Sequence, residues 1–508
     1  MTMTQRAAHP WQSRALGVLW FLLAVRLLAM CFIPLNDTTE ARYAEIARKM
    51  LETGDWVTLQ HAYHVPFWGK PPLSTWFAAA AMAVFGVNAL AARLPSLLLA
   101  LGVLALLWHF ARRRQGADGA LLTTLFLASS PLFLLSAGAV MTDPALLFAT
   151  TLSLLAFWRA LQDADRLWAY TFFVGLGLGL LAKGPLALVL VALPAATWVL
   201  LRGQWQLCWR RLPWLSGTLL CLLIAAPWYV WAEARTPGFL EYFIMGEHVR
   251  RFLDSGWKGD LYGFAHATPR GMIWPYALVA VLPWSALLAL WLWRQRARFA
   301  ALRRDSDGWL LYLALWAGMP LLFFSFSGNI IWPYALPALP GFALLCAELC
   351  CRARTDVDVD TDANAAGSAR FLPPLAAASG VVMLAAIIAF LAWPGSIANA
   401  QDRLVAAWQA DRPGLDSQLL YWHGPRRFSA EFYSAGRAQR SDDSARLLAL
   451  LDNDSIDYLA VASAEYNTLP PRIAAGFEEL GRYAGASGTM MLLRERATSR
   501  HPESPGGG

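Results

Sequence analysis

Residues 92–114 read ARLPSLLLALGVLALLWHFARRR, an apolar run of twenty residues closed by three arginines. A helix of about 20 predominantly apolar residues is long enough to cross the hydrocarbon core of a bilayer. Membrane proteins keep an excess of arginine and lysine in the cytoplasmic loops beside such helices. The stretch therefore predicts a transmembrane helix whose C-terminal end lies in the cytoplasm.

The composition of the whole chain agrees with this stretch. Of its 508 residues, 57% are hydrophobic and 15% are charged, whereas soluble domains carry roughly 25% charged residues. The net charge of +7 comes from basic residues scattered between apolar runs, which fits membrane topology better than nucleic-acid binding. The six cysteines form no CxxC pair and predict no disulfide framework.

Apolar runs of spanning length recur along the chain, so we expect an all-α polytopic membrane protein of about eleven transmembrane helices. The runs lie near 14–34, 92–111, 119–140, 144–161, 167–182, 184–201, 213–233, 271–293, 308–326, 330–351 and 371–393. With the N-terminus in the cytoplasm, the arginine clusters of five loops fall on the inner side: Arg112–Arg114, Arg159 and Arg166, Arg202 to Arg211, Arg294 to Arg304, and Arg352 to Arg370. If Pro72–Val87 crossed the membrane, every later loop would change sides and the arginine clusters would lie outside. This segment is therefore expected to be a shorter helix at the outer interface.

This threading predicts the domain boundaries. A transmembrane domain covers 1–393, with outer loops at 35–91 and 234–270, and a small outer α/β domain covers 394–496. The α/β domain is indicated by strand-like runs and one helix-like run. The strands are Gln418–Trp422, Tyr458–Ala462 and Met490–Leu493, and the helix is Asp442–Leu451. Residues 355–369 are expected to be a polar cytoplasmic linker, and 497–508 a disordered tail.

Two carboxylates follow the first predicted span. Asp37 and Glu40 are three residues apart at an expected helix start. Either carboxylate is a candidate base for an acceptor hydroxyl. The alternative is a capping box, in which Asp37 is the N-cap and Glu40 reaches back to it. The two interpretations are compatible, because a capping carboxylate can also accept a proton.

Lysine is rare in this chain, and all of its lysines lie on one predicted side of the membrane. Only four of the 42 basic residues are lysines, and all four lie on the predicted outer side: Lys49, Lys70, Lys183 and Lys258. Lys70 and Lys183 stand in Pro-flanked turns beside apolar runs, where a compact ammonium suits a phosphate oxygen. Snorkelling towards lipid headgroups is the alternative.

Further polar residues gather on the outer face. Asp143 ends the third predicted span and can cap the next helix, which begins with Pro144. The second outer loop contains Glu247, His248 and Arg251, which offer a base, a metal ligand and a phosphate partner. A single histidine is more often structural than metal-binding, so no cofactor is expected, and a divalent metal at His248 is the weaker alternative.

Several motifs together resemble a known family. They are Asp37–Ala47, Gly54–Val57, Phe67–Leu73, Ala92–Ser96, Met141–Pro144, Ala182–Pro185, Glu247–His248 and Phe323–Pro337. In this order, over about residues 10–350, they resemble the bacterial membrane glycosyltransferases related to protein O-mannosyltransferases, and most of all the lipid A 4-amino-4-deoxy-L-arabinose transferases.

The resemblance implies a GT-C fold in a bacterial inner membrane, with an outer-face cavity and a C-terminal domain in the periplasm. It implies transfer of a sugar from undecaprenyl phosphate to lipid A. Asp37 matches the first-loop aspartate needed for activity, Asp143 matches a second cavity aspartate, and Lys70 matches a lysine that meets the donor phosphate.

Two positions depart from the aminoarabinose transferases. Gly69 replaces a glutamate that helps hold a metal together with a histidine like His248, so a metal-independent transfer is expected. Gly328-Asn329-Ile330 stands where a later loop usually carries a lysine, which indicates different donor recognition.

The hypothesis from the sequence is therefore an inverting glycosyl transfer. Asp37 takes the acceptor proton, and the departing polyprenyl phosphate is stabilised by Lys70, Lys183, Arg251 and, more weakly, Arg42. Transfer to lipopolysaccharide core or to protein is the alternative within this class. A flippase or transporter is the alternative from another class, but it favours ionisable residues inside the spans. Here Arg26 is nearly the only charge well inside a predicted span.

Overall fold

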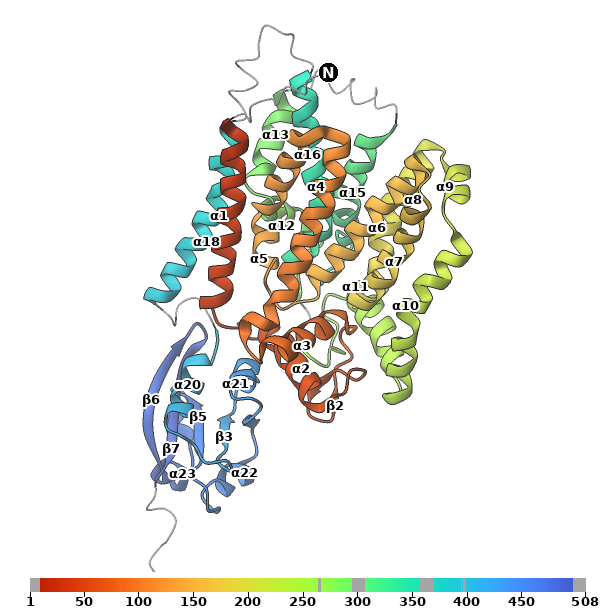
Figure 1. The fold of residues 1–508 in the computed structure, drawn as a ribbon. Helices are drawn as coiled ribbons and strands as arrows, with labels where there is room; N and C mark the ends of the chain where they lie inside the picture. The colour runs from red at the N-terminus through yellow and green to blue at the C-terminus, as the bar shows by residue number, and fades with distance from the viewer. Residues whose placement is uncertain are drawn as a thin grey trace, which may run out of the picture.

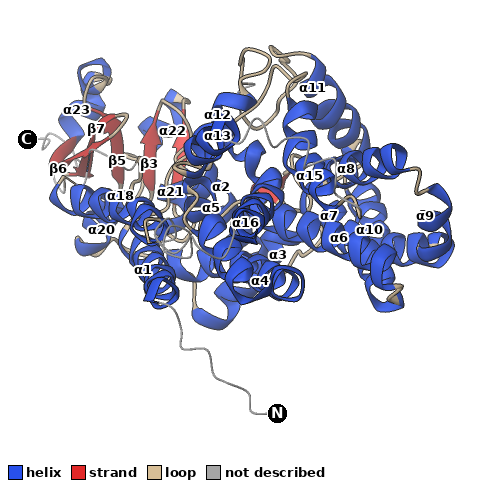
Figure 2. Ribbon diagram, turned by 90° about the horizontal axis from the view of Figure 1, so that it is seen from above, coloured by secondary structure: helices blue, strands red, loops and turns tan. Residues whose placement is uncertain are grey.

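The computed structural model of the chain describes residues 10–263, 266–294, 307–355, 370–393, 395 and 399–496. The predicted tail 497–508 and, apart from Thr355, the predicted linker 355–369 lie outside the described residues. Figure 1 shows a bundle of helices with a sheet-containing domain at one end. Seen from above, the sheet lies on one side of the molecule and α7–α10 lie on the opposite side (Figure 2).

Six helical segments in the described part of the chain are long and apolar enough to cross a membrane. They are α1 (Pro10–Phe32), α4 (Ala89–Ala128), α6 (Asp143–Asp163), α10 (Trp214–Arg235), Trp332–Arg352 and α18 (Leu372–Ala392). The segment Trp332–Arg352 comprises η3 (Trp332–Ala338) and most of α16 (Leu339–Thr355). Further helices of the bundle are α7 (Arg166–Lys183), α8 (Leu186–Arg202), α9 (Trp205–Arg211) and α15 (Trp309–Phe324). The chain is thus a multi-span membrane protein with fewer long spans than the apolar runs predict.

Two of the apolar runs are broken helices. The run 119–140 continues α4 beyond a non-helical Gly116, and then stops at Ala128 before the short helix α5 (Pro131–Ser136). The run 271–293 consists of α12 (Ile273–Ala280) and α13 (Trp284–Arg294), which meet at 100°. Both breaks adjoin a proline, which cannot donate to the preceding turn and clashes with it. Hydropathy alone does not reveal these breaks.

The loop predicted to lie on the outer side, 35–91, folds into two helices and a strand pair. It contains α2 (Thr39–Thr53), the strand pair β1 (Gln60–Ala62) and β2 (Val65–Pro66), and α3 (Leu73–Phe85). Gly54 ends α2 with a φ of 67°, a conformation that glycine adopts without strain. The helix α3 confirms the short helix expected over 72–87. The second loop contains the π-helix η1 (Glu241–Arg250) and α11 (Arg251–Leu253).

The C-terminal region forms a mixed sheet with helices on it. Its strands are β3 (Leu419–Trp422), β4 (Ala438–Ser441), β5 (Tyr458–Ala462), β6 (Phe477–Gly485) and β7 (Gly488–Glu495), in the order β4-β3-β5-β7-β6. β3 is parallel to both β4 and β5, whereas β7 is antiparallel to β5 and β6. The accompanying helices are α20 (Asp402–Ala410), α21 (Phe428–Tyr433), α22 (Ser444–Ala449) and α23 (Pro471–Gly476).

The three predicted strands and the predicted helix of this region are confirmed as β3, β5, β7 and α22. The edge strands β4 and β6 do not follow from the sequence, because AQRS is largely polar and β6 exposes most of its residues. In Figure 1 this domain, α2 and α3 lie at the same end of the bundle, opposite the N-terminal end of α1. The outer loop and the C-terminal domain therefore share one end of the molecule.

Candidate active site

Lys70 joins the first outer loop to the second. It stands in the turn between β2 and α3, and its Nζ donates to the Glu247 carboxylate of η1 at 2.9 Å. Arg251, one helical turn after Glu247, donates to the same carboxylate at 3.1 Å and pairs with Asp260 at 3.1 Å. Two cations predicted to meet phosphate are thus held by one buried glutamate.

A second ion pair joins the ends of two bundle helices. Lys183, the last residue of α7, donates to Asp143, the first residue of α6, at 2.6 Å. The helix dipoles favour a carboxylate at an N-terminus and an ammonium at a C-terminus. Both side chains are about 10% exposed or less. The Lys183 ammonium also lies 4.8 Å from the centre of the Tyr334 ring.

Shared neighbours connect the two ion pairs. Tyr334 lies within electrostatic range of Lys70 and Arg251 as well as over Lys183. His248, next to Glu247, lies with its Nε2 3.1 Å from the Lys183 carbonyl oxygen. We call this group the cation cluster; its members are Lys70, Lys183, Arg251, Asp143, Glu247 and Tyr334. The sequence predicts the three cations and Asp143 but not Tyr334, which lies in an apolar stretch without a polar signal.

The charges of the cluster are fixed by their neighbours. Burial by itself would raise the pKa of Glu247, but the positive charges of Lys70 and Arg251 lower it to about 2. Burial likewise works against the charged form of Lys70, yet the Glu247 carboxylate, with Tyr43 and Tyr334, raises its pKa. Glu247 therefore stays ionised and Lys70 stays protonated at neutral pH.

His248 has a structural role in this arrangement. Its Nδ1 lies 2.7 Å from the Phe243 carbonyl oxygen, and burial lowers the pKa of the ring. Within the ranges that the structure describes, no group of three or more His, Cys, Asp or Glu is placed to hold a metal ion. Both ring nitrogens face backbone carbonyls, so His248 fixes η1 against the end of α7.

Gly184 permits this close contact, and its substitution gives a first prediction. It has a φ of 73°, and an added Cβ would lie 2.6 Å from the Phe243 ring. We expect Gly184→Ala to cost roughly 2–5 kcal/mol of stability through left-handed strain and overpacking. Gly203→Ala is the matched control, because Gly203 has a φ of 64° with nothing within 4 Å. Equal losses in thermal unfolding of the two variants would contradict the packing role.

Asp37 and Glu40 do not form the predicted capping box. The N-cap of α2 is Thr38, without a side-chain cap. Glu40 instead accepts hydrogen bonds from the Arg93 guanidinium at 2.8 and 2.7 Å. It also accepts hydrogen bonds from the Val140 amide at 3.2 Å and from the Asn36 amide at 3.3 Å. The capping prediction is wrong because Arg93, 53 residues further along the chain, takes the glutamate.

Asp37 is bound by the C-terminal domain. The amide and hydroxyl of Ser429 in α21 donate to its carboxylate at 3.0 and 2.5 Å. The Asp37 amide donates to the Asn399 carbonyl at 2.9 Å, and Asp37 as a residue is only 8% exposed. Among the described residues, none of the hydrogen-bond partners of Asp37 and Glu40 belongs to the cation cluster. Ser429 is a partner that no pattern near Asp37 could reveal, since 392 residues separate the two.

Arg42 contacts the second outer loop. Its guanidinium donates to the Tyr262 carbonyl at 2.5 Å and lies over the rings of Tyr43 and Phe67. These contacts fasten α2 to the second outer loop. Phosphate binding by Arg42 stays a prediction.

The environment of Asp37 gives a second prediction, on pH. Burial, partly offset by the Ser429 hydrogen bonds and Arg427, raises the pKa of Asp37 from 3.8 to about 6. The docked C-terminal domain therefore binds a proton more tightly than the undocked one. Docking is most favourable below about pH 4. As the pH rises through 6, the docking free energy becomes less favourable by about 3 kcal/mol. Glu431, the carboxylate whose charge acts on Asp37, has a lowered pKa because Arg426 and Lys49 bind it.

Hydrogen exchange of α21 in the full chain measures this docking at pH 5 and pH 7.5. After correction for the intrinsic exchange rate, we expect α21 of the wild type to exchange more slowly at pH 5 than at pH 7.5. In Asp37→Asn we expect equal corrected rates at the two pH values. A pH dependence that persists in the variant would assign the effect to another group.

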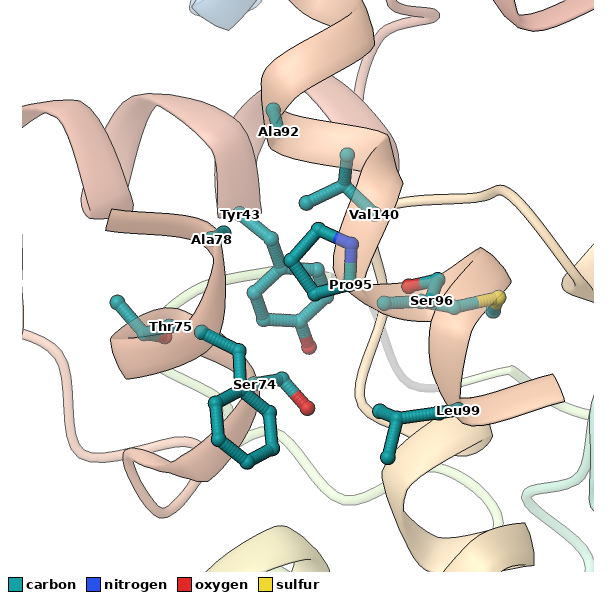
Figure 3. Close-up of a pocket in the computed structure, with 11 residues that line it drawn as sticks. Tyr43, Ser74, Thr75, Ala78, Ala92, Pro95, Ser96, Leu99 and Val140 are labelled. Atoms are coloured by element: carbon teal, nitrogen blue, oxygen red, sulfur yellow. The ribbon is translucent and has the colours of Figure 1, made fainter. Parts of the chain in front are cut away.

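A small pocket lies near Tyr43, between α2, α3, α4 and the segment before α6 (Figure 3). Its volume is about 10 Å³, which is enough for about one water molecule. The buried hydroxyl of Ser74 lines it and has no hydrogen-bond partner among the described residues. The pocket is too small for a sugar and fits a single bridging water.

Comparison with known proteins extends this description. Residues 15–243 match the family Dolichyl-phosphate-mannose-protein mannosyltransferase. An undecaprenyl phosphate-alpha-4-amino-4-deoxy-L-arabinose arabinosyl transferase of Pseudomonas aeruginosa strain UCBPP-PA14 is 33% identical, covering 64% of this chain and 58% of its own. The form numbered 1 in Pseudomonas fluorescens strain Pf-5 is 34% identical, with coverages of 68% and 59%. The chain thus spans 58–59% of the length of these relatives.

Solved structures share the fold. ArnT from Cupriavidus metallidurans bound to undecaprenyl phosphate superposes with a TM-score of 0.74 at 20% identity, covering 98% of this chain and 100% of its own. The archaeal oligosaccharyltransferase AglB from Archaeoglobus fulgidus gives 0.53 at 11% identity, with coverages of 95% and 74%. The motifs, the fold and these relatives agree: the chain has the GT-C fold and is similar to the protein O-mannosyltransferase-like superfamily of membrane proteins.

Proposed function

We propose that the chain is a glycosyltransferase that moves a sugar from undecaprenyl phosphate to a periplasmic acceptor at the bacterial inner membrane. The favoured reaction is transfer of 4-amino-4-deoxy-L-arabinose or a related sugar to lipid A. The names of the relatives support this choice. The observation that carries it is the cation cluster, in which Lys70, Lys183 and Arg251 are gathered beside Asp143.

The cations suit the leaving group. A polyprenyl phosphate sugar is a phosphodiester, and breaking its bond to the anomeric carbon adds one negative charge to the phosphate. Preorganised cations in a site of low dielectric stabilise that charge as it develops. Lys70 and Arg251 share Glu247, and Lys183 is held by Asp143. The donor phosphate would compete with these carboxylates for the same ammonium and guanidinium groups.

Asp143 is the carboxylate that we assign as the general base. Once the donor phosphate engages Lys183, the Asp143 carboxylate is released to accept the proton of the acceptor hydroxyl. The acceptor oxygen bonds to the anomeric carbon from the face opposite the departing phosphate, so the transfer inverts. The cluster loses one negative charge at Asp143 as the phosphate gains one.

Asp37 and Glu40 receive a different role in this proposal. Their carboxylates are bound by Ser429 and by Arg93, respectively, so we propose that they position the C-terminal domain and α4 around the site. Lipopolysaccharide core and protein remain alternative acceptors. A flippase is less favoured because the paired charges gather at helix ends and in the outer loops.

The reaction can be tested by mass spectrometry of lipid A, core oligosaccharide and glycoproteins from strains with and without the gene. Loss of a pentosamine mass from lipid A supports the favoured acceptor. Loss from core or protein instead would reassign the acceptor within the same enzyme class. Unchanged masses in all three fractions would overturn the proposed function.

A further inference from the structure

Arg26 is a buried charge without a counter-ion of its own. It lies in α1, is 8% exposed, and its Nε has no hydrogen-bond acceptor within the described residues. Its charged neighbours are Arg93 and Glu40. Glu40 already accepts two hydrogen bonds from Arg93, so two guanidinium groups share one carboxylate. One positive charge is left without compensation in an apolar part of the protein.

A groove opens beside this arginine. It runs between α1, α4 and α5, which lie together in Figure 1, and its volume is about 290 Å³. Apart from Arg26 and Thr124 its walls are apolar or aromatic. They include Leu16, Leu19, Leu23, Leu97, Leu101 and Leu104. Leu16 and Leu101 are exposed at its rim, so the groove is open on the side of the surrounding lipid.

The groove runs along the expected membrane normal. Arg26 precedes Phe32, the outer end of α1, by about 9 Å, and Leu16 lies about 15 Å further towards the inner end, at 1.5 Å per residue. The charge therefore stands at the outer end of an apolar channel. A lipid of the outer leaflet presents its groups in the same order, with the headgroup outside and the chain inside.

We propose that this groove binds one anionic phospholipid of the outer leaflet, with its phosphate on Arg26 and one acyl chain along the groove. A guanidinium forms bidentate hydrogen bonds to phosphate. An unpaired charge among apolar side chains at this depth is costly, so a phosphate partner removes the penalty. The site shares no residue with the cation cluster, and the inference does not rest on the proposed function.

The test is native mass spectrometry of the purified full chain with added phosphatidylglycerol or phosphatidylcholine. We expect the wild type to retain phosphatidylglycerol in preference, and Arg26→Gln to lower that preference about tenfold or more. Arg14→Gln is the matched control, because Arg14 lies on the same helix but does not line the groove. It should behave as the wild type does.

A second variant keeps the test valid if Arg26→Gln does not fold. Leu101→Trp retains the charge but narrows the rim of the groove, and we expect it to weaken retention of both lipids. Equal retention of the two lipids by the wild type would overturn the proposal. Unchanged retention in both variants would also overturn it, as would displacement of phosphatidylglycerol by equimolar undecaprenyl phosphate, which would identify a prenyl phosphate site instead.

Discussion

Asp143→Asn is expected to lower the rate of sugar transfer by about 10²–10⁴, the usual contribution of a general base. The asparagine amide preserves the shape of the side chain and can still contact Lys183, but it cannot accept the acceptor proton. Because Asp143 faces Lys183 at 2.6 Å, loss of its charge should leave the ammonium free and should not weaken donor binding. The expected signature is a fall in kcat with little change in the KM for the donor.

Asp37→Asn is the comparison that decides between the two aspartates. Its carboxylate is buried against Ser429 of the C-terminal domain, so we expect transfer to continue at close to the wild-type rate. Both variants are assayed with the same reconstituted donor, and membrane insertion is checked by their yield in the membrane fraction. Abolished transfer in Asp37→Asn together with activity in Asp143→Asn would restore Asp37 as the base.

Four members of the cation cluster could be predicted from the sequence to lie near one another, for a physical reason. Lys70, Lys183, Asp143 and Arg251 stand in turns or at helix ends of predicted outer loops, so hydropathy places them on one face. Their pairing could not be predicted. Lys70 meets Glu247 across 177 residues, and Lys183 meets Asp143 across 40. No local spacing encodes such contacts, because the packing of the helices brings them together.

Asp37 is a second case in which local sequence could not predict the contact partner. Its spacing from Glu40 is that of a capping box, and local reasoning can test only local partners. The actual partner of Asp37 is Ser429 of the C-terminal domain, and that of Glu40 is Arg93 of α4. The broken helices are a related case: Pro131 and Pro283 interrupt apolar runs whose hydropathy is continuous. The polarity of a segment predicts whether it faces lipid or water better than it predicts which residues it contacts.

Lys49 holds the C-terminal domain on the outer loop, and its replacement gives the largest expected structural effect. It is fully buried between Glu45 of α2 at 3.0 Å and Glu431 of α21 at 2.9 Å. Removing one partner of a buried ion pair leaves an uncompensated charge and costs about 3–5 kcal/mol. Lys49→Met should therefore weaken docking, and hydrogen exchange of α21 should become roughly 10²–10⁴ times faster.

Lys258→Met is the matched control, because Lys258 is another of the four lysines and lies exposed on the second outer loop. Its exchange at α21 should equal that of the wild type. The double variant Lys49→Met with Glu431→Met should recover part of the loss, since apolar side chains can replace a buried ion pair at little cost. Unchanged exchange in Lys49→Met would mean that Arg48 and Arg426, which also pair with Glu45 and Glu431, suffice to neutralise the interface. Docking would then rest on the remaining hydrogen bonds, among them Ser429 to Asp37 and Leu35 to Tyr433, and protonation of Asp37 would modulate it.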